Sequence, residues 1–339
     1  MINSCCGESN LLTDVPGIVV GNASDEGIKS GVTVVTADQP FTAAVQISGG
    51  APGTRETDLL APDKLVNSVD ALVLSGGSAL GLDAASGVAN ALRKVNRGFE
   101  VSGQRVPLVP AAIIFDLANG GDKQWKDNPY PALGEQAWRM AADRFELGSV
   151  GAGTGALASG LKGGLGSASL VVKTVHSGFT VAALVVVNPV GSVTVPGKPN
   201  FWAAAAEIGA EYGALGSVVD ADPYAIPERK PMARENTTLA IVATDAPLDV
   251  AQLQRLAIAS HDGMARAIYP AHTPFDGDLV FALSTTPVNA VNAVNAADQM
   301  ILGHSASMCV SRAIARGVFL AEKKAGDVLP TWQERWGRT

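Results

Sequence analysis

Apolar residues recur along the chain with two different spacings, and the shorter spacing predicts β-strands. Runs rich in Val, Ile and Thr, bounded by Gly, Pro, Asn or Asp, are typical of strands. The predicted strands are residues 32–36, 43–48, 71–75, 111–115, 169–175, 179–187, 239–244 and 279–283. Only the short link His-Ser-Gly at 176–178 separates two of these runs, so they should pair as an antiparallel hairpin.

Alanine-rich segments with helical spacing predict the helices. They cover residues 78–95, 133–145, 201–212, 248–268 and 291–321. Because strands and helices do not alternate strictly, layered sheets covered by helices fit better than a doubly wound parallel sheet. Residues 218–236 hold three prolines and seven charged residues without periodicity, which indicates an exposed connector ahead of the strand at 239–244.

Composition narrows the class of protein. A net charge of −7, with 25 basic and 32 acidic residues and no basic block, argues against nucleic acid as a partner. The apolar run 181–187 is far shorter than the roughly 18–20 residues that span a bilayer, so no membrane partner is expected. The N-terminus carries no pattern of a secretory signal, and we expect a cytoplasmic protein.

Cysteine and histidine spacing gives no sign of a disulfide framework or a metal site. The three cysteines, Cys5, Cys6 and Cys309, are an odd number without zinc-type spacing. The four histidines form no H-E-x-x-H pattern or other close pair. We therefore expect no metal and no cofactor.

The junction Asn236-Thr237-Thr238 stands where the connector meets the strand. Threonine favours strands and asparagine favours the preceding turn, which explains most such triplets, and the N-x-T glycosylation pattern needs a secretory route. A third interpretation is self-processing, in which the Thr237 hydroxyl attacks the preceding carbonyl and hydrolysis of the ester frees an α-amine. That amine can then act as the general base for its own hydroxyl.

Two glycine-rich stretches resemble other motifs only in part. "GAGTGA" at 151–156 fits G-x-G-x-x-[GA] but follows no clear strand, so it is a weak dinucleotide signal. "SGGSALG" at 75–81 lacks the second glycine of a nucleophile elbow around Ser78. A tight turn at Gly76 and Gly77, with backbone amides facing a substrate cleft, remains open.

Polar residues also appear at the ends of apolar runs. Asp276 and Asp278 lie two apart at the entrance to a strand, where an Asp-Gly turn is the plain alternative. Lys162 and Asn188 each interrupt small or apolar stretches, and singly either could be an ordinary surface lysine or a turn-forming Asn-Pro.

Taken in order, these segments resemble the self-cleaving N-terminal-nucleophile amidohydrolases, which include L-aminopeptidase/D-esterases, β-peptidyl aminopeptidases and nylon-oligomer hydrolases. The resemblance runs through "LTDVPGIVVGN", "ALVLSGGSALGLDAA", "VPAAIIFDL", "GAGTGA…LKGGLGSAS", "VVVNPVG", "ENTTLAIVATDAPL" and "FDGDLVFAL". It implies a four-layer α/β/β/α sandwich with mixed sheets and a homo-oligomer, often a tetramer. It also implies one hydrolase domain, 1–339, cleaved into 1–236 and 237–339.

The resemblance assigns roles to individual residues. Thr237 would be the nucleophile and Asn236 the new C-terminus of the long chain. Asp276 and Asp278 match an acidic pair that orients the nucleophile. Lys162 matches a lysine close to the nucleophile, and Asn188 matches an asparagine facing the oxyanion.

One position departs from the nylon-oligomer hydrolase branch, which has tyrosine where this chain has Phe115. The implied activity is hydrolysis of a small amide or peptide through an acyl-enzyme. Two alternatives stay open: acyl transfer of the ornithine-acetyltransferase type, and a non-catalytic small-molecule binding protein. Cyclisation of Asn236 on its own carbonyl is a further chemical alternative for cleavage.

Overall fold

The strands of the computed structural model form one large hydrogen-bonded network and two small hairpins. The model describes residues 4–173, 178–222, 224–226, 236–288 and 293–337. The large network runs β1-β11-β12-β13-β14-β3-β5-β8-β4, with β2 paired to β3. Its strands are β1 (Ser4–Cys5), β2 (Ile18–Asp25), β3 (Ser30–Ile47), β4 (Thr54–Arg55), β5 (Ser68–Ser75), β8 (Ala111–Ile113), β11 (Gly164–Lys173), β12 (Gly178–Asn188), β13 (Thr237–Thr244) and β14 (Leu279–Ser284). The hairpins are β6 (Phe99–Val101) with β7 (Gln104–Val106), and β9 (Leu157–Ala158) with β10 (Leu161–Lys162).

Strand β3 connects two layers of the network. Its first half pairs with β2 and β5, whereas its second half pairs with β14. The register shifts between Thr36 and Phe41, where residues 38–40 are exposed and Pro40 cannot donate to a ladder. The runs predicted as separate strands at 32–36 and 43–48 are therefore one irregular strand.

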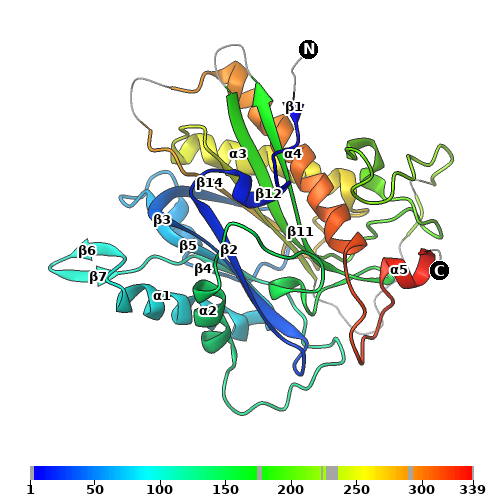
Figure 1. Cartoon of the computed structure of the whole chain (residues 1–339), viewed down its shortest axis with the longest axis horizontal. Helices are drawn as coiled ribbons and strands as arrows, with labels where there is room; N and C mark the ends of the chain where they lie inside the picture. Colours follow the sequence, from blue (N-terminus) through cyan, green and yellow to red (C-terminus); the bar gives the residue numbers. More distant parts are fainter. Residues whose placement is uncertain (1–3, 174–177, 223, 227–235, 289–292, 338–339) are drawn as a thin grey trace.

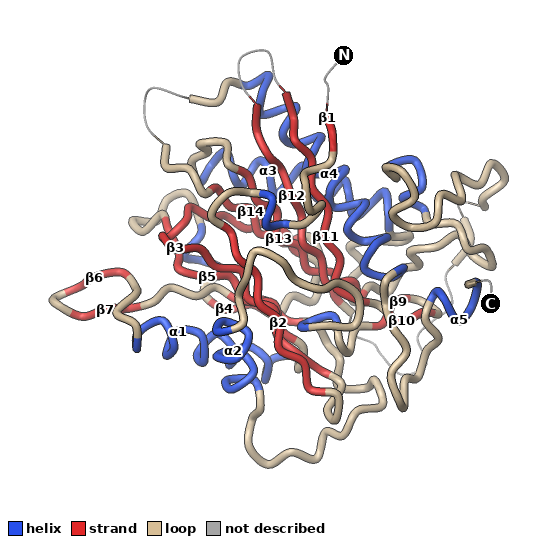
Figure 2. The backbone as a smooth tube through the Cα atoms, in the orientation of Figure 1, coloured by secondary structure: helices blue, strands red, loops and turns tan. Residues whose placement is uncertain are grey.

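Helices cover the outer faces of both sheet layers (Figures 1 and 2). Three apolar cores lie between the layers: one under α3 and α4, one between the sheets, and one under α1 and α2. The helices are α1 (Ala84–Lys94), α2 (Tyr130–Arg139), α3 (Val250–Ala267), α4 (Ala296–Phe319) and α5 (Trp332–Trp336). The fold is the expected α/β/β/α arrangement, with antiparallel and parallel pairs in the same sheet.

Strand β13 shows how the sequence produces these layers. Alternate side chains of a strand point to opposite faces. Leu239 and Ile241 enter the core between the sheets, and Ala240 and Val242 enter the core under α3 and α4. Because both faces are buried, the strand is a nearly continuous apolar run, and its backbone is fixed along its whole length.

The predicted helices are confirmed where the apolar stripe is long, and they are displaced elsewhere. The segment 78–95 becomes a 3-10 turn, Ser78–Asp83, followed by α1, and the predictions 248–268 and 291–321 correspond to α3 and α4. Helix α2 begins three residues earlier than predicted and ends at Arg139, before the predicted end at residue 145. The predicted helix at 201–212 is wrong.

Only Trp202–Ala206 of that segment is helical, as a 3-10 turn. The Glu207 side chain accepts hydrogen bonds from the backbone of Tyr212 and Ala214, at 2.8 and 2.9 Å. Gly209 has a φ of +66°. A side chain that captures backbone donors and a left-handed glycine both end helical geometry.

The expected hairpin is confirmed by the antiparallel pairing of β11 with β12, which extends to Lys173 and Gly178. Residues 176 and 177 of the predicted turn lie outside the described residues. In the connector, Val219, Tyr224 and Ile226 are exposed, and 223 and 227–235 lie outside the described part of the chain.

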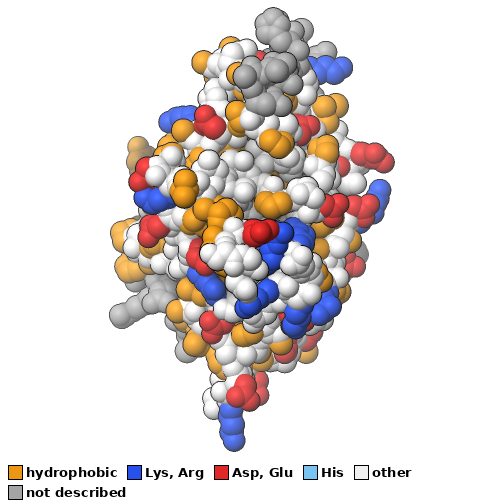
Figure 3. All heavy atoms as spheres, turned by 90° about the vertical axis from the view of Figure 1, so that its left-hand side faces the viewer, with side chains coloured by type: hydrophobic (Ala, Val, Ile, Leu, Met, Phe, Trp, Pro, Cys, Tyr) orange, Lys and Arg blue, Asp and Glu red, His pale blue; other side chains and the backbone are white. Residues whose placement is uncertain are grey.

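The molecular surface carries charges of both signs. Figure 3 shows Lys and Arg side chains gathered on the face from which the β6–β7 hairpin projects, with Asp and Glu close by. Exposed ion pairs join Arg105 to Glu100 and Lys94 to Glu135. Among the described residues, no helix combines the length and apolar character needed to cross a bilayer.

A buried ion pair ties α4 to the segment that follows Trp202–Ala206. Arg312 Nε lies 2.6 Å from Glu211 Oε1, and both side chains are at least nine-tenths buried. The Arg312 guanidinium also donates to the carbonyl oxygen of Ser169 and to Asn10 Oδ1, at 2.9 Å each. This pair links the two segments that cleavage at 236/237 would separate.

Replacing Arg312 with methionine should destabilise the chain by about 3–5 kcal/mol, because the buried Glu211 carboxylate loses its short ion pair. The carboxylate keeps the 3.8 Å contact with Arg316 Nε and the 2.8 Å hydrogen bond from Asn10 Nδ2. Urea unfolding of the uncleaved Thr237→Ala chain would measure the difference. The matched control is Lys94→Met, which breaks an exposed pair and should leave the unfolding midpoint unchanged. Equal midpoints for all three chains would contradict the prediction.

Candidate active site

Thr237 is the first residue of β13, in the interior of the large sheet network. It lies opposite Asn188 of β12, and β14 flanks the strand on the other side. Both Asn236 and Thr237 are 3% exposed. Asn236, the last residue of the predicted exposed connector, forms a bridge with Asp276 and is held in the protein interior.

The junction brings a hydroxyl against a peptide carbonyl. Thr237 Oγ1 donates to the Asn236 carbonyl oxygen at 2.5 Å. The same oxygen accepts from the Gly277 backbone N–H at 2.8 Å, while the Asn236 N–H donates to the Phe275 carbonyl oxygen at 2.9 Å. The carbonyl next to the Thr237 hydroxyl is therefore polarised by a fixed backbone donor.

Glycine at position 277 is required by this close approach. A Cβ atom built there would lie 2.7 Å from Thr237 Oγ1 and 2.7 Å from the Ala51 carbonyl oxygen. Real Cβ atoms essentially never make such short contacts. The backbone of the Asp-Gly-Asp sequence therefore approaches the Thr237 hydroxyl at Gly277, where a larger residue would not fit.

Asp276 holds its own loop and the residues after β12. Its Oδ1 accepts from the Val190 N–H at 3.0 Å, and its Oδ2 accepts from the Thr273 hydroxyl at 2.5 Å and from the Thr273 N–H at 3.1 Å. Burial, and secondarily the neighbouring Asp278, raise the pKa of Asp276.

Asp278 is attached to β13 itself. Its Oδ1 accepts from the Thr238 N–H at 2.7 Å, and its Oδ2 accepts from the His272 N–H at 3.0 Å and lies 2.9 Å from His272 Nδ1. Like Asp276, it has no exposed surface in the uncleaved chain. These two carboxylates therefore hold the strand and the loop beside Thr237.

Asn188 lies across from Thr237 and is 1% exposed. Its Oδ1 accepts from the Leu157 N–H at 2.9 Å, and its Nδ2 donates to the Phe115 carbonyl oxygen at 3.3 Å. The side chain therefore bridges β9 and the segment after β8, and these contacts fix its amide beside the start of β13.

Lys162 occupies a buried cluster next to β9. It pairs in register with Leu157, and its Nζ lies 2.7 Å from Asp327 Oδ2, while Lys29 Nζ lies 2.6 Å from Asp327 Oδ1. The Lys162 side chain is 2% exposed. Burial lowers the pKa of Lys162, opposed by Asp327.

Gly76 and Gly77 form the tight turn expected after β5. Their N–H groups donate to the Gly31 carbonyl oxygen at 2.9 Å and to Asp116 Oδ1 at 2.8 Å. Both donors are thus used within the protein, and contact of this turn with substrate stays a prediction. Phe115, on the neighbouring segment, is half-buried and contacts the site through its carbonyl oxygen.

The "GAGTGA" stretch has no strand–loop–helix geometry. Gly151–Gly153 is a short 3-10 turn. The N–H groups of Gly151 and Ala152 donate to the Ser24 and Thr33 hydroxyls, at 2.8 and 3.0 Å. Because the turn binds its own protein, it lends no support to a nucleotide or anion cradle.

Three residues beside the site were not singled out from the sequence. His272 and Gly277 lie within the "HTPFDGD" motif, of which only the two aspartates were considered as site residues. Asp327 is far along the sequence from the lysines with which it forms ion pairs. A histidine four residues before Asp276 was the available signal for His272. No local pattern links Asp327 to Lys162.

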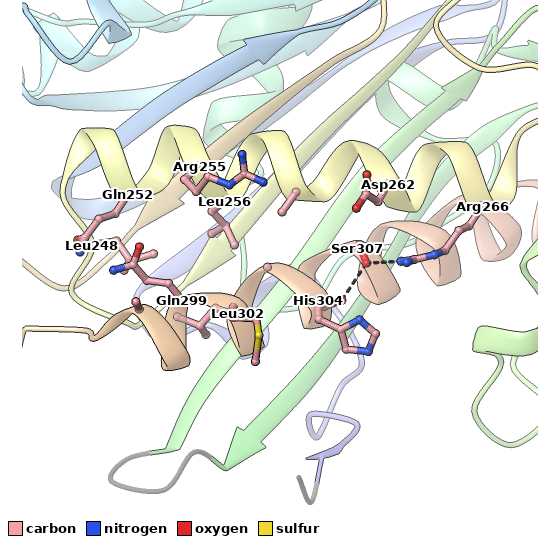
Figure 4. A pocket seen from close by; sticks show the side chains of 14 residues that line it. Leu248, Gln252, Arg255, Leu256, Asp262, Arg266, Gln299, Leu302, His304 and Ser307 are labelled. Carbon is pink, nitrogen blue, oxygen red and sulfur yellow. Dashed lines mark hydrogen bonds between the residues drawn. The ribbon is translucent and has the colours of Figure 1, made fainter. Parts of the chain in front are cut away.

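A cavity of about 420 Å³ opens elsewhere, between α3 and α4 on the outer helix layer (Figure 4). Its lining includes Arg255, Asp262, Arg266 and His304, and Arg266 Nη1 donates to the Ser307 hydroxyl at 2.6 Å. None of the candidate site residues lines it.

Within the described residues, no group of three or more His, Cys, Asp or Glu side chains could hold a metal ion.

Comparison with protein families and sequences gives a consistent match over almost the whole chain. The family model described as peptidase family S58 matches residues 10–328. An uncharacterised aminopeptidase of Mycobacterium tuberculosis is 41% identical over 345 residues, covering 96% of this chain and 97% of that relative. A 6-aminohexanoate-oligomer endohydrolase of Paenarthrobacter ureafaciens is 30% identical over 298 residues, covering 84% of this chain and 77% of the relative.

Solved structures share the fold at lower identity. A β-aminopeptidase from Burkholderia sp. superposes with a TM-score of 0.72 at 21% identity, covering 99% of this chain and 97% of the other. The L-aminopeptidase D-Ala-esterase/amidase of Ochrobactrum anthropi, described as a variant of the Ntn-hydrolase fold, gives 0.68 at 21% identity, covering 99% and 96%.

Proposed function

The chain belongs to peptidase family S58, and from this premise we propose that it is a self-cleaving amide hydrolase whose nucleophile is Thr237. Hydrolysis of amide or peptide bonds follows from the family. The observation that carries the finer proposal is the contact between Thr237 Oγ1 and the Asn236 carbonyl oxygen, with Gly277 N–H on the same oxygen.

Maturation begins at this contact. The hydroxyl attacks the Asn236 carbonyl carbon, the C–N bond breaks, and the acyl group moves from the Thr237 nitrogen to its oxygen. The Gly277 N–H is in place to stabilise the oxyanion as it forms. Water then hydrolyses the ester, which leaves a carboxylate on Asn236 and a free amine on Thr237. The hydroxyl contact favours this route over cyclisation of Asn236.

Turnover uses the same hydroxyl on an external amide. The free α-amine, with a reference pKa of about 7.7–8.0, accepts the hydroxyl proton while the oxygen attacks the substrate carbonyl. In this proposal Asn188 is the side chain that stabilises the oxyanion, a contribution of about 2.7–4 kcal/mol for a single donor. Lys162 supplies a nearby cation, and water releases the acyl group.

The two processed chains should stay together as one molecule. After cleavage, β13 and β14 of residues 237–339 remain hydrogen-bonded to β12 and β3 of residues 1–236. Buried ion pairs also cross between the two parts, from Lys162 to Asp327 and from Glu211 to Arg312. Because β13 is hydrogen-bonded on both sides, its new N-terminus stays in position and does not fray. Catalysis by a precisely positioned group requires this rigidity.

The relatives' names suggest the class of substrate. By their names, one relative is an aminopeptidase and another hydrolyses 6-aminohexanoate oligomers, and we propose a small amide or peptide as the substrate. Phe115 offers no phenolic hydroxyl, so nylon oligomers should not be assumed. Aminoacyl amides, β-peptides and aminohexanoate oligomers are the panel to assay, with a homo-oligomer as the expected assembly.

Hydroxylamine added during turnover should produce the hydroxamate of the substrate's acyl group, because it competes with water for the acyl-enzyme. Mass spectrometry would detect the hydroxamate, and the ratio of hydroxamate to free acid would separate efficient acyl transfer from hydrolysis. The uncleaved Thr237→Ala chain is the control and should form neither product. Turnover by the wild type without hydroxamate at any hydroxylamine concentration would contradict a covalent intermediate.

A further inference from the structure

Two histidines form a hydrogen-bonded chain that ends on Asp278. His272 contributes both its backbone N–H and its ring Nδ1 to Asp278 Oδ2, at 3.0 and 2.9 Å. On its other side, His272 Nε2 lies 3.3 Å from His261 Nδ1. His261 Nε2 in turn lies 3.0 Å from the Gln46 carbonyl oxygen. The chain therefore runs from β3, through α3, to the carboxylate that holds β13.

The donors and acceptors of these hydrogen bonds determine which ring nitrogens carry hydrogens. A backbone carbonyl can only accept, so His261 Nε2 must donate to Gln46. Burial lowers the pKa of His261 to about 4, so the ring is neutral near pH 7 and its Nδ1 is an acceptor. His272 Nε2 must then donate to His261 Nδ1.

The remaining nitrogen of His272 faces the carboxylate of Asp278. A carboxylate is an acceptor, so His272 Nδ1 must donate as well. His272 thus carries hydrogens on both nitrogens and is an imidazolium, paired with a carboxylate whose side chain has no exposed surface.

Other charged groups near this pair do not change the assignment. Asp276 shares the same loop, and burial raises its pKa, which reduces its charge. Asp262 of α3 acts on His261 from the helix side, and its effect is the weakest of the causes. The strand β3 contributes the neutral carbonyl of Gln46.

We propose that His272, oriented by His261, is a positioning residue that holds the Asp278 carboxylate on the Thr238 N–H and so fixes the start of β13 for catalysis. The functional part of this inference rests on the proposed role of Thr237. If His272 loses its second proton, one contact must fail: a lone pair then faces either Asp278 Oδ2 or His261 Nδ1. The Gln46 carbonyl fixes the tautomer of His261. The donor and acceptor roles along this row of hydrogen bonds therefore cannot be exchanged to restore both contacts.

The protonation pattern can be measured without any enzyme activity. Nitrogen NMR of the protein labelled at its four histidines, in both the wild type and the uncleaved Thr237→Ala chain, would report each ring nitrogen separately. We expect one histidine with both nitrogens protonated near neutral pH, assigned to His272 by its loss in His272→Asn, and His261 protonated only at Nε2. A neutral His272 at that pH would overturn the inference, whatever the nucleophile.

Kinetics of matched variants tests the positioning role. His272 has a φ of +55°, a conformation that asparagine tolerates, and an asparagine amide can donate from nearly the position of Nδ1. His272→Ala should lower kcat about 10- to 100-fold, the usual effect of removing a residue that supports a catalytic group, with a smaller change in KM. His272→Asn should restore most of kcat.

His304→Ala is the control, because His304 is exposed on α4 and should leave kcat and the pH profile unchanged. A His272→Ala enzyme with wild-type kcat and pH profile would overturn the positioning role. An active Thr237→Ala enzyme would instead reject the proposed nucleophile. The NMR test of the His272 protonation does not depend on that result.

Discussion

The Thr237→Ala chain is expected to remain a single 339-residue polypeptide and to lose amide hydrolysis. Alanine removes the single hydroxyl oxygen that would first attack Asn236 and would then form the acyl-enzyme. Loss of a nucleophile in comparable hydrolases lowers kcat by about 10⁴- to 10⁶-fold. A denaturing gel, intact mass and N-terminal sequencing would show wild-type fragments 1–236 and 237–339, the latter beginning Thr-Thr-Leu-Ala, and an uncut variant.

Two further variants make this result specific. Thr237→Ser keeps a hydroxyl at the same position and should still cleave itself. Thr244→Ala changes a buried threonine at the other end of the same strand, where its hydroxyl accepts only from the Ala246 N–H, so it should cleave normally. An active wild-type preparation that consists only of intact chain would reject cleavage as the activating event.

The sequence alone predicted the layers of the fold because the strands that form them are buried on both faces. Residues 181–187, 239–244 and 279–283 are nearly continuous apolar runs, and all lie in strands whose alternate side chains enter two different cores. Such a pattern has few alternative structures. The prediction failed at 201–212, where alanine-rich composition suggested a helix but the Glu207 side chain binds the backbone of Tyr212.

The candidate site could be predicted where its reactive residues are adjacent in the sequence. The Asn236-Thr237 junction and the Asp276-Gly277-Asp278 motif were both visible in the sequence, and the structure brings them together through the Gly277 N–H. Contacts between distant segments were not visible. Asp327 meets Lys162 across 165 positions, and His261 meets Gln46 across 215, so no local pattern could reveal them.

Burial also changes what the motif residues can do. The sequence does not show how deeply Asp276 and Asp278 are buried, and aspartate is usually exposed. In the uncleaved chain each carboxylate instead accepts hydrogen bonds from neighbouring segments. Their role is therefore argued from the backbone they hold, and the backbone between them becomes the most sensitive position of the site.

Gly277→Ala is expected to slow self-cleavage about 100-fold while the chain still folds. The added methyl would lie 2.7 Å from both Thr237 Oγ1 and the Ala51 carbonyl oxygen. Relieving that overlap must move either the hydroxyl or the Gly277 N–H away from the Asn236 carbonyl oxygen, which they contact at 2.5 and 2.8 Å. A displacement of about 1 Å in a reacting pair can lower a rate about 100-fold.

The measurement is the time course of precursor disappearance after purification, followed on denaturing gels, with circular dichroism to establish that the variant is folded. Gly178→Ala is the matched control: within the described part of the chain its added methyl would meet only the Val172 carbonyl oxygen, at 3.8 Å, so this variant should mature at the wild-type rate. A folded Gly277→Ala chain that matures as fast as the control would show that the contact between Thr237 and the Asp-Gly-Asp backbone does not govern cleavage. Slow maturation together with normal folding would instead locate the rate-determining geometry at this one backbone position, and would separate it from the stability that the buried carboxylates provide.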